Sequence, residues 1–113
     1  MHELSICRRI MDIVLEHVAA HPCIRVKKVV LEIGQLVAVE QSALIQSFQL
    51  LTKGTIAENA KLEINDMAGQ GVCESCGKTV HLSQYYDACS ACGSYSLTVI
   101  QGEVLRVQSM EVE

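Results

Sequence analysis

The sequence predicts an α+β fold in which two helices pack on a three-stranded sheet, with a zinc-ribbon module inserted before the last strand. Two segments repeat apolar residues at helical spacing, and three short segments are rich in aliphatic and β-branched residues. Between the second and third of these strands, the chain loses its aliphatic periodicity and carries two C-x2-C pairs. We therefore expect an α/β domain formed by 1–66 plus 101–113 and an inserted zinc ribbon over 67–100.

The first helix is predicted over 3–20, and it ends before Pro22, because proline disfavours a helical residue in front of it. A second helix is expected from about 40 to 52, with Gly54 as its stop. Both helices carry an apolar stripe at steps of three and four residues. The stripes consist of Leu4, Cys7, Met11, Val14 and Val18 in the first helix and Leu44, Ile45, Phe48 and Leu51 in the second.

Three strands are predicted from short aliphatic runs. The first covers 25–33 and ends at Gly34, the second covers 61–65, and the last begins at Val104. We expect helices and strands to share one core, which would contain Leu4, Met11, Val14, Val29, Leu31, Leu44, Phe48 and Leu62.

Size and charge limit the classes of function. A chain of 113 residues is expected to form one domain with at most a small added module. The formal net charge is −4, and the nine basic residues cluster only at Arg8-Arg9 and Lys27-Lys28, which argues against a nucleic-acid surface. Charged residues interrupt the start of the chain, so no secretory signal is expected, and no apolar run reaches the length of a membrane span. The expected compartment is the cytoplasm.

Four of the six cysteines form the strongest motif. Cys73 and Cys76 form one C-x2-C pair, and after twelve residues Cys89 and Cys92 form another. Two such pairs supply four thiolates, which matches the tetrahedral preference of Zn²⁺ and leaves no open position for an activated water. We predict a structural zinc site that folds this aliphatic-poor segment. Two redox-active dithiols or an iron–sulfur cluster are the alternatives.

The first three residues, Met-His-Glu, form a possible second metal site. A free N-terminal amine, the amide nitrogen of His2 and its imidazole can close two adjacent chelate rings around a metal that accepts deprotonated amide nitrogens. Ni²⁺ and Cu²⁺ do so in a square-planar field, whereas Mg²⁺ and Ca²⁺ do not. The amide nitrogen or carboxylate of Glu3, or another part of the protein, could supply a fourth ligand. The alternative is an ordinary helix start, in which Glu3 complements the helix dipole.

Several motifs together resemble the HypA/HybF family of nickel-insertion accessory proteins for NiFe hydrogenase and, in some organisms, for urease. These motifs are MHELS at the start, LEIG at 31–34, SFQLLTKGT at 47–55, AKLEI at 60–64, the paired C-x2-C and the final EVE. The resemblance covers the whole chain, and its most specific parts are the start and the cysteine spacing. It implies two helices against a three-stranded sheet, with the zinc ribbon inserted before the last strand.

The resemblance also implies roles for particular residues. His2 would be the essential nickel ligand, with backbone nitrogens from Met1 and Glu3, in a nickel-binding domain formed by 1–66 plus 101–113. The zinc ligands would be Cys73, Cys76, Cys89 and Cys92. The implied partners are the GTPase HypB, the hydrogenase large-subunit precursor and, for a urease client, urease accessory proteins, with the chain acting as a monomer or homodimer.

Two departures from the family pattern affect the zinc segment. Gly77 and Gly93 stand where some members have a histidine beside a C-x2-C pair, and Met67-Ala68-Gly69 stands where many members have a proline. The second departure leaves the connection into the zinc segment open.

The remaining cysteines, histidines and tyrosines carry weaker signals. Cys7 is interpreted as a buried small hydrophobe, and Cys23 as a free thiol in a loop. Tyr85 and Tyr86 are expected to pack over the ribbon. Solvent exposure is the favoured interpretation of His17, His21 and His81, although His81 could serve as an additional nickel ligand.

These observations predict a cytoplasmic nickel metallochaperone that is not an enzyme, because no nucleophile constellation or phosphate-binding loop is present in the sequence. The alternative is a zinc-ribbon module that binds nucleic acid or a transcription complex, which the net charge of −4 argues against and a salt-sensitive gel shift would support. A dithiol oxidoreductase is a third hypothesis, and it requires redox-active cysteines rather than zinc ligands.

Overall fold

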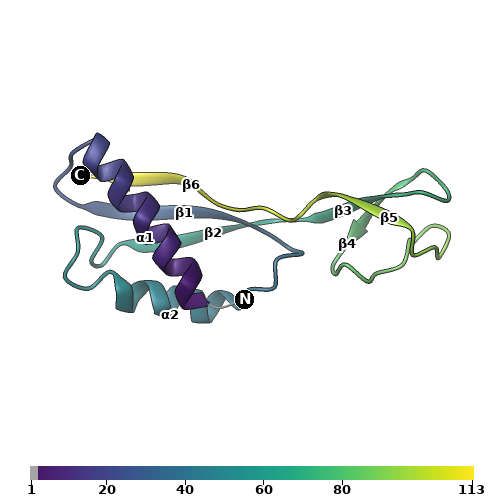
Figure 1. Ribbon diagram of the computed structural model, residues 1–113, viewed down its shortest axis with the longest axis horizontal. Helices are drawn as coiled ribbons and strands as arrows, with labels where there is room; N and C mark the ends of the chain where they lie inside the picture. The colour runs from purple at the N-terminus through teal and green to yellow at the C-terminus, as the bar shows by residue number, and fades with distance from the viewer. Residues whose placement is uncertain (1–2) are drawn as a thin grey trace. The chain divides into compact units, whose positions relative to one another are not determined.

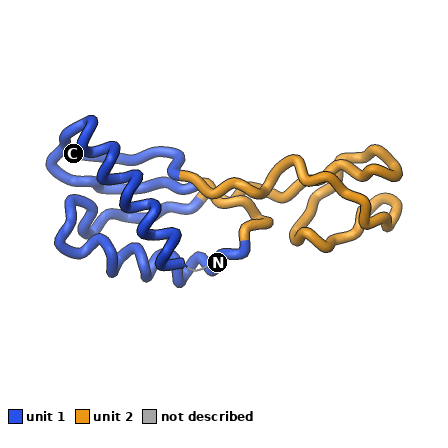
Figure 2. The backbone as a smooth tube through the Cα atoms, viewed as in Figure 1, with its two compact units in different colours: residues 1–31, 38–64, 107–113 blue, residues 32–37, 65–106 orange. Residues whose placement is uncertain are grey.

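The structure is a computed structural model that describes residues 3–113, and its chain divides into two compact units. Unit 1 contains the described residues up to Leu31 together with 38–64 and 107–113, and unit 2 contains 32–37 and 65–106 (Figure 2). The elements follow the order α1 (Glu3–Ala20), β1 (Val26–Gly34), α2 (Gln41–Leu51), β2 (Lys61–Met67), β3 (Gly69–Cys73), β4 (Thr79–Leu82), β5 (Leu97–Gln101) and β6 (Leu105–Val112) (Figure 1).

The α+β prediction is confirmed: residues 3–113 form two helices and two three-stranded sheets in the orders β2-β1-β6 and β4-β3-β5. Both helices and the three predicted strands lie within two residues of their expected bounds. The boundaries of the compact units differ from the predicted segments, because 32–37, 65–66 and 101–106 belong to unit 2. Strands β1, β2 and β6 each contribute residues to both units.

Unit 1 is built around an aliphatic core beneath the two helices. Leu44 and Phe48 of α2 and Val14 of α1 are fully buried, and the Cys7 thiol of α1 donates a hydrogen bond of 3.3 Å to the carbonyl of Leu44. The core also contains Ile6, Ile10, Met11, Val26, Val29, Val30, Leu31, Ala57, Ala60 and Leu62. The helices therefore pack directly on each other through the apolar faces that the periodicity predicted.

The prediction that Leu4 belongs to the core is wrong. The side chain of Leu4 is 45% exposed, whereas the other seven predicted core residues are buried. The first buried residue of α1 is Ile6, so the covered stripe begins after the position that the periodicity selected. Periodicity gives the angle of a side chain around the helix, but it does not show where the covering element ends.

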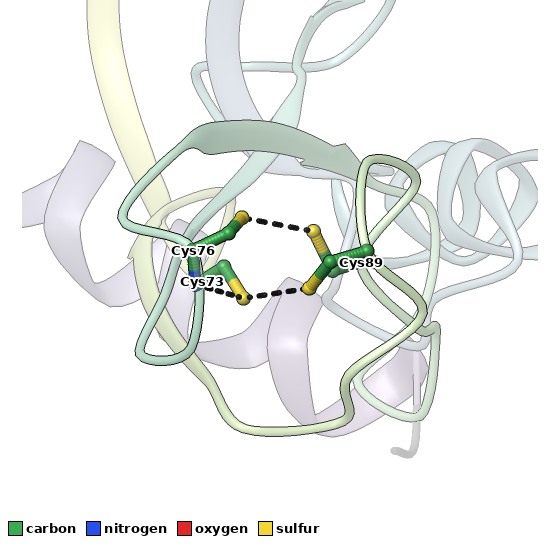
Figure 3. A group of neighbouring side chains, drawn as sticks. Cys73, Cys76 and Cys89 are labelled. Atoms are coloured by element: carbon green, nitrogen blue, oxygen red, sulfur yellow. Dashed lines mark hydrogen bonds between the residues drawn. The ribbon is translucent and has the colours of Figure 1, made fainter.

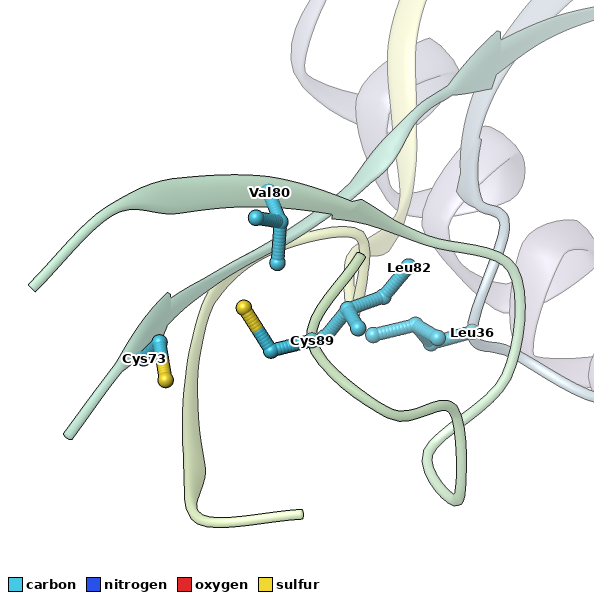
Figure 4. Packing of buried hydrophobic residues seen from close by; sticks show 5 residues of the cluster. All are labelled: Leu36, Cys73, Val80, Leu82 and Cys89. Atoms are coloured by element: carbon cyan, nitrogen blue, oxygen red, sulfur yellow. The ribbon is translucent and has the colours of Figure 1, made fainter. Parts of the chain in front are cut away.

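Unit 2 has a small core that the sequence did not predict. β3 pairs antiparallel with β4, and with β5 on its other edge, where the register shifts between Gln70 and Gly71. The buried cluster contains Leu36, Val80 and Leu82 together with Cys73 and Cys89 (Figure 4), and Leu97 and Val99 pack against it. Two of its five buried members are thus cysteines that the sequence predicted as zinc ligands.

Backbone contacts within unit 2 hold the segment that leads into β3. The Gln35 N–H donates to the carbonyl of Met67 at 2.7 Å, and the Gln101 side-chain amide donates to the carbonyl of Ala68 at 2.9 Å. A side chain at Gly34 would collide with the carbonyl of Gly102, whose own φ is 106°. These contacts, rather than a proline, fix the course of the connection.

Among the residues described, no helix combines the length and the apolar character needed to cross a membrane.

Candidate metal centre

Each C-x2-C pair sits in a tight backbone turn. Cys73 is the last residue of β3, and the Gly77 N–H donates to its carbonyl at 2.8 Å. The second turn repeats this geometry, since the Gly93 N–H donates to the carbonyl of Cys89 at 2.8 Å. Gly77 and Gly93 have φ values of 75° and 79°, a region that residues with a Cβ adopt with strain. The glycine after each pair therefore closes the turn that brings two sulfurs together.

Further hydrogen bonds close each turn, and one of them joins the two turns. The Cys73 N–H donates to the carbonyl of Lys78 at 2.9 Å, and the Cys89 N–H donates to the carbonyl of Ser94 at 2.7 Å. Across the site, the Ser75 hydroxyl donates to the hydroxyl oxygen of Ser94 at 3.0 Å. These hydrogen bonds orient the two turns so that their sulfurs face one site.

The four sulfur atoms converge on one point (Figure 3). All lie within 4.8 Å of one another, with 3.5 Å between Cys73 Sγ and Cys92 Sγ and 3.8 Å between Cys76 Sγ and Cys89 Sγ. A tetrahedral Zn²⁺ with Zn–S bonds of about 2.3 Å places its sulfurs about 3.8 Å apart. The donor set and its spacing therefore fit a closed Cys₄ zinc site. Within the described part of the chain, this is the one group of three or more histidine, cysteine, aspartate or glutamate side chains that could hold a metal ion.

Electrostatics at the cluster favour thiolates on one residue of each pair. The backbone N–H of Cys76, with that of Ser75, lowers the pKa of Cys73 to about 6. In the same way the backbone N–H of Cys92, with that of Ala91, lowers the pKa of Cys89. At Cys92, the Ser94 N–H favours the thiolate, but hydrogen bonds with Cys73 and the other cysteines outweigh it and raise the pKa to about 12. Four sulfurs this close cannot all carry negative charge without a cation, and a divalent metal supplies it.

The predicted nickel ligand His2 and its neighbour Met1 lie outside the described residues. Glu3 is described at the start of α1, where its Oε1 accepts a hydrogen bond of 3.3 Å from the backbone N–H of Glu40. The Glu40 carboxylate in turn accepts a hydrogen bond of 2.8 Å from the Ser42 hydroxyl. Residue 3 is thus attached to the start of α2 within unit 1.

The other sequence candidates have different surroundings. His81 is exposed, and its Nε2 lies 2.8 Å from the side-chain oxygen of Gln35. His17 and His21 are exposed on α1 and directly after it, as predicted. The expectation that Tyr85 and Tyr86 pack over the ribbon is wrong, because they are 57% and 74% exposed and the Tyr85 hydroxyl donates instead to the Glu103 carboxylate at 2.7 Å. The ribbon core is filled by short aliphatic side chains and the cysteines, so bulky rings are not needed there.

Comparison with known proteins decides the family. The family model described as "Hydrogenase/urease nickel incorporation, metallochaperone, hypA" matches residues 1–112. The chain belongs to the HypA family. "Hydrogenase maturation factor HypA" of Legionella pneumophila (strain Lens) is 51% identical, and that of Acidithiobacillus ferrooxidans (strain ATCC 53993 / BNL-5-31) is 48% identical, each over 113 residues that cover all of both chains.

Solved HypA structures share the fold. The solution structure of the nickel metallochaperone HypA from Helicobacter pylori has a TM-score of 0.68 at 24% identity, covering 99% of this chain and 97% of that one. A second structure, titled "Solution structure of HypA protein", has a TM-score of 0.71 at 24% identity, covering 100% and 97%. HypA membership confirms the resemblance derived from the sequence and places the chain in a nickel metallochaperone family with a four-cysteine cluster that fits zinc.

Proposed function

We propose that this chain binds Ni²⁺ through the His2 imidazole and backbone nitrogens of Met1 and Glu3, and delivers it for maturation of NiFe hydrogenase or of urease. The observation that carries the proposal is the HypA family match, which runs from residue 1 through the zinc segment to residue 112. An imidazole joined to an amine and amide nitrogens is a donor set that Ni²⁺ accepts in a square-planar field.

The start of α1 supports a nickel site in which one of the proposed ligand residues, Glu3, is held by the rest of unit 1. Glu3 is the first residue of α1, and its side chain accepts a hydrogen bond from the Glu40 backbone within unit 1. A metallochaperone needs ligands that can be exchanged one at a time. A short N-terminal segment in front of an anchored Glu3 meets that requirement.

The zinc segment has a structural role in this proposal. We assign nickel binding to 1–66 plus 101–113 and zinc binding to 67–100, with Cys73, Cys76, Cys89 and Cys92 as the ligands. Four protein ligands leave a zinc ion no open position for water activation, so the chain transfers nickel without catalysing a reaction.

The proposed partners follow from the family. They are the GTPase HypB, which would supply the nucleotide energy, the hydrogenase large-subunit precursor, and urease accessory proteins where urease is the client. We propose that the chain works in the cytoplasm as a monomer or homodimer, and that neither nucleic acid nor a membrane is a partner.

The test is a nickel titration of three untagged, zinc-loaded proteins: the wild type, His2→Ala, and a form with a few residues added before Met1. The wild type should bind one Ni²⁺ tightly. Both altered forms should lose that tight site and keep their zinc, because neither change touches the core or the cysteine cluster. Acidification should weaken nickel binding, since protons compete for the amine and the imidazole.

Equal tight binding by all three proteins would show that Met-His-Glu is an ordinary helix start. In that case the family assignment would stand, but the location of the nickel site would be wrong.

A further inference from the structure

Two histidines at the end of α1 form a pair that the nickel proposal does not use. His17 lies in the last turn of α1 and His21 follows one turn later, with a backbone hydrogen bond of 2.9 Å from the His21 N–H to the His17 carbonyl. Their ring centroids are 4.9 Å apart, and the ring planes are inclined by 44°. We propose that His17 and His21 form a second, weaker Ni²⁺ site. The choice of Ni²⁺ as the ion rests on the proposed function, whereas the site itself rests on the two rings.

The ring separation fits joint coordination of one ion. With a metal–nitrogen bond of about 2.1 Å, an imidazole centre lies about 3.2 Å from the ion, so two cis ligands have centres about 4.5 Å apart. The observed 4.9 Å therefore requires only a small rotation of two exposed side chains. Residues four apart on a helix lie on the same face, which makes this chelate a local property of the helix.

The surroundings of the pair also favour a cation. His17 and His21 line a shallow hollow together with Glu16, which is exposed, and with the apolar residues Ile13 and Ala20. The C-terminal end of a helix carries partial negative charge, which attracts cations. Among the described residues neither imidazole makes a hydrogen bond, so binding would displace only water. Arg25, the next basic residue along the chain, is paired with Glu113 at 2.6 Å.

Such a site would hold nickel loosely. Two imidazoles supply two protein ligands, and water would complete the coordination shell. The N-terminal site instead offers amine and amide nitrogens in adjacent chelate rings. The histidine pair is therefore suited to capture an ion that exchanges rapidly, not to retain it.

The experiment uses the full-length, zinc-loaded chain carrying His2→Ala, so that the proposed N-terminal site is absent. Ni²⁺ is titrated while amide signals are followed by two-dimensional NMR, because paramagnetic nickel broadens nearby signals. We expect broadening centred on residues 17–21. His21→Gln should weaken this binding by about tenfold or more, since even the loss of a supporting contact to a metal ligand costs about that much.

The matched control is the double variant His17→Ala with Ala19→His, which keeps the number of histidines. Residues two apart point away from each other on a helix, so this variant should weaken nickel binding at 17–21 as much as His21→Gln does. His81→Gln should change nothing at residues 17–21. Circular dichroism of each variant checks that the helices remain.

The outcomes separate the two proposals. If nickel leaves 17–21 unbroadened, or if the register-shifted variant binds equally well, the histidine pair is not a site, whatever His2 does. If His2→Ala retains tight stoichiometric nickel that His21→Gln removes, the pair is a nickel site and the proposed N-terminal location is wrong.

Discussion

The two units of this chain bury different kinds of side chain. Unit 1 has a core of aliphatic residues around a fully buried Phe48, contributed by both helices and the strands beneath them. In unit 2 the buried cluster has three aliphatic members, Leu36, Val80 and Leu82, and its other two are Cys73 and Cys89. Residues 83–96 of unit 2 contain no strand or helix. A conventional core supports unit 1, whereas in unit 2 the expected metal ligands are part of the core.

Because of this difference, removal of zinc would destabilise unit 2 in two ways. It would remove the metal–sulfur bonds that join the two C-x2-C turns. It would also leave the cysteine sulfurs close together, two of them on buried residues, without the cation that balances their charge. Unit 1 has no such dependence, since none of its described side chains belongs to the cysteine cluster. The largest predicted effect therefore concerns the metal.

Cys73→Ser should abolish stoichiometric zinc binding and unfold the β4-β3-β5 sheet. Cys73 joins β3 to the cluster and is itself 1% exposed, so its loss removes a ligand and a core contact together. The helical circular dichroism signal should persist, because α1 and α2 both belong to unit 1. Zinc analysis and NMR dispersion of residues 69–101 provide the measurement.

The matched control is Cys23→Ser, which changes a half-buried thiol outside the cluster and should retain zinc. Undiminished zinc in Cys73→Ser would refute the ligand assignment. Collapse of the helical signal together with the ribbon would show instead that the units do not fold separately.

The second prediction concerns the core of unit 1, where a substitution should lower stability without affecting zinc. Phe48→Ala should lower the free energy of unfolding of unit 1 by roughly 3–5 kcal/mol, because it removes a fully buried ring and leaves a cavity between the helices and the sheet. Zinc content should stay unchanged, since Phe48 lies in the other unit. Denaturant unfolding followed by helical circular dichroism, with zinc assayed in the folded protein, checks both statements.

Leu4→Ala is the control for that measurement. Leu4 was predicted to belong to the same core as Phe48 but is 45% exposed, so the loss should stay below about 1 kcal/mol. A cost at Leu4 equal to that at Phe48 would contradict the packing of α1.

The same contrast explains what the sequence could predict. In unit 1, helical periodicity around Val14 and Phe48 is sufficient to place both helices, because a conventional core imposes regular spacing. In unit 2, β3, β4 and β5 have four or five residues each and no apolar alternation long enough to identify them. In unit 2, only the cysteine spacing predicted a folded structure, because the ligands of one metal ion must converge whatever residues surround them.

Contacts between residues distant in sequence were beyond prediction. The exclusion of a side chain at Gly34 depends on the Gly102 carbonyl, which lies far along the chain. The burial of Thr52, whose hydroxyl donates to the Phe48 carbonyl at 2.9 Å, likewise depends on the packing around the end of α2. At the metal centre, the spacing predicted the ligands but not the Ser75–Ser94 bond across the turns.

The smallest predicted effect concerns a cysteine of unit 1 that contrasts with those of the cluster. Burial, with a smaller contribution from the Glu3 carboxylate, raises the pKa of Cys7 from 9.0 to about 11, whereas backbone N–H groups lower that of Cys73 to about 6. The folded state thus favours a neutral Cys7 thiol. Its contribution to stability is complete below pH 9.0 and is lost as the pH rises to about 11.

Alkylation with iodoacetamide tests this, because the thiolate is the reactive form. At pH 8, Cys7 in the folded, zinc-loaded protein should react about a hundredfold more slowly than Cys7 in the guanidinium-unfolded chain, because a rise in pKa from 9.0 to about 11 lowers the thiolate fraction by about that factor. Mass mapping distinguishes it from the other cysteines. Glu3→Gln should leave most of the protection in place, because burial is the larger cause. Rapid labelling of Cys7 in the folded wild type would mean that α1 and α2 separate readily around its hydrogen bond to the Leu44 carbonyl, and the core of unit 1 would then be looser than that of a conventional domain.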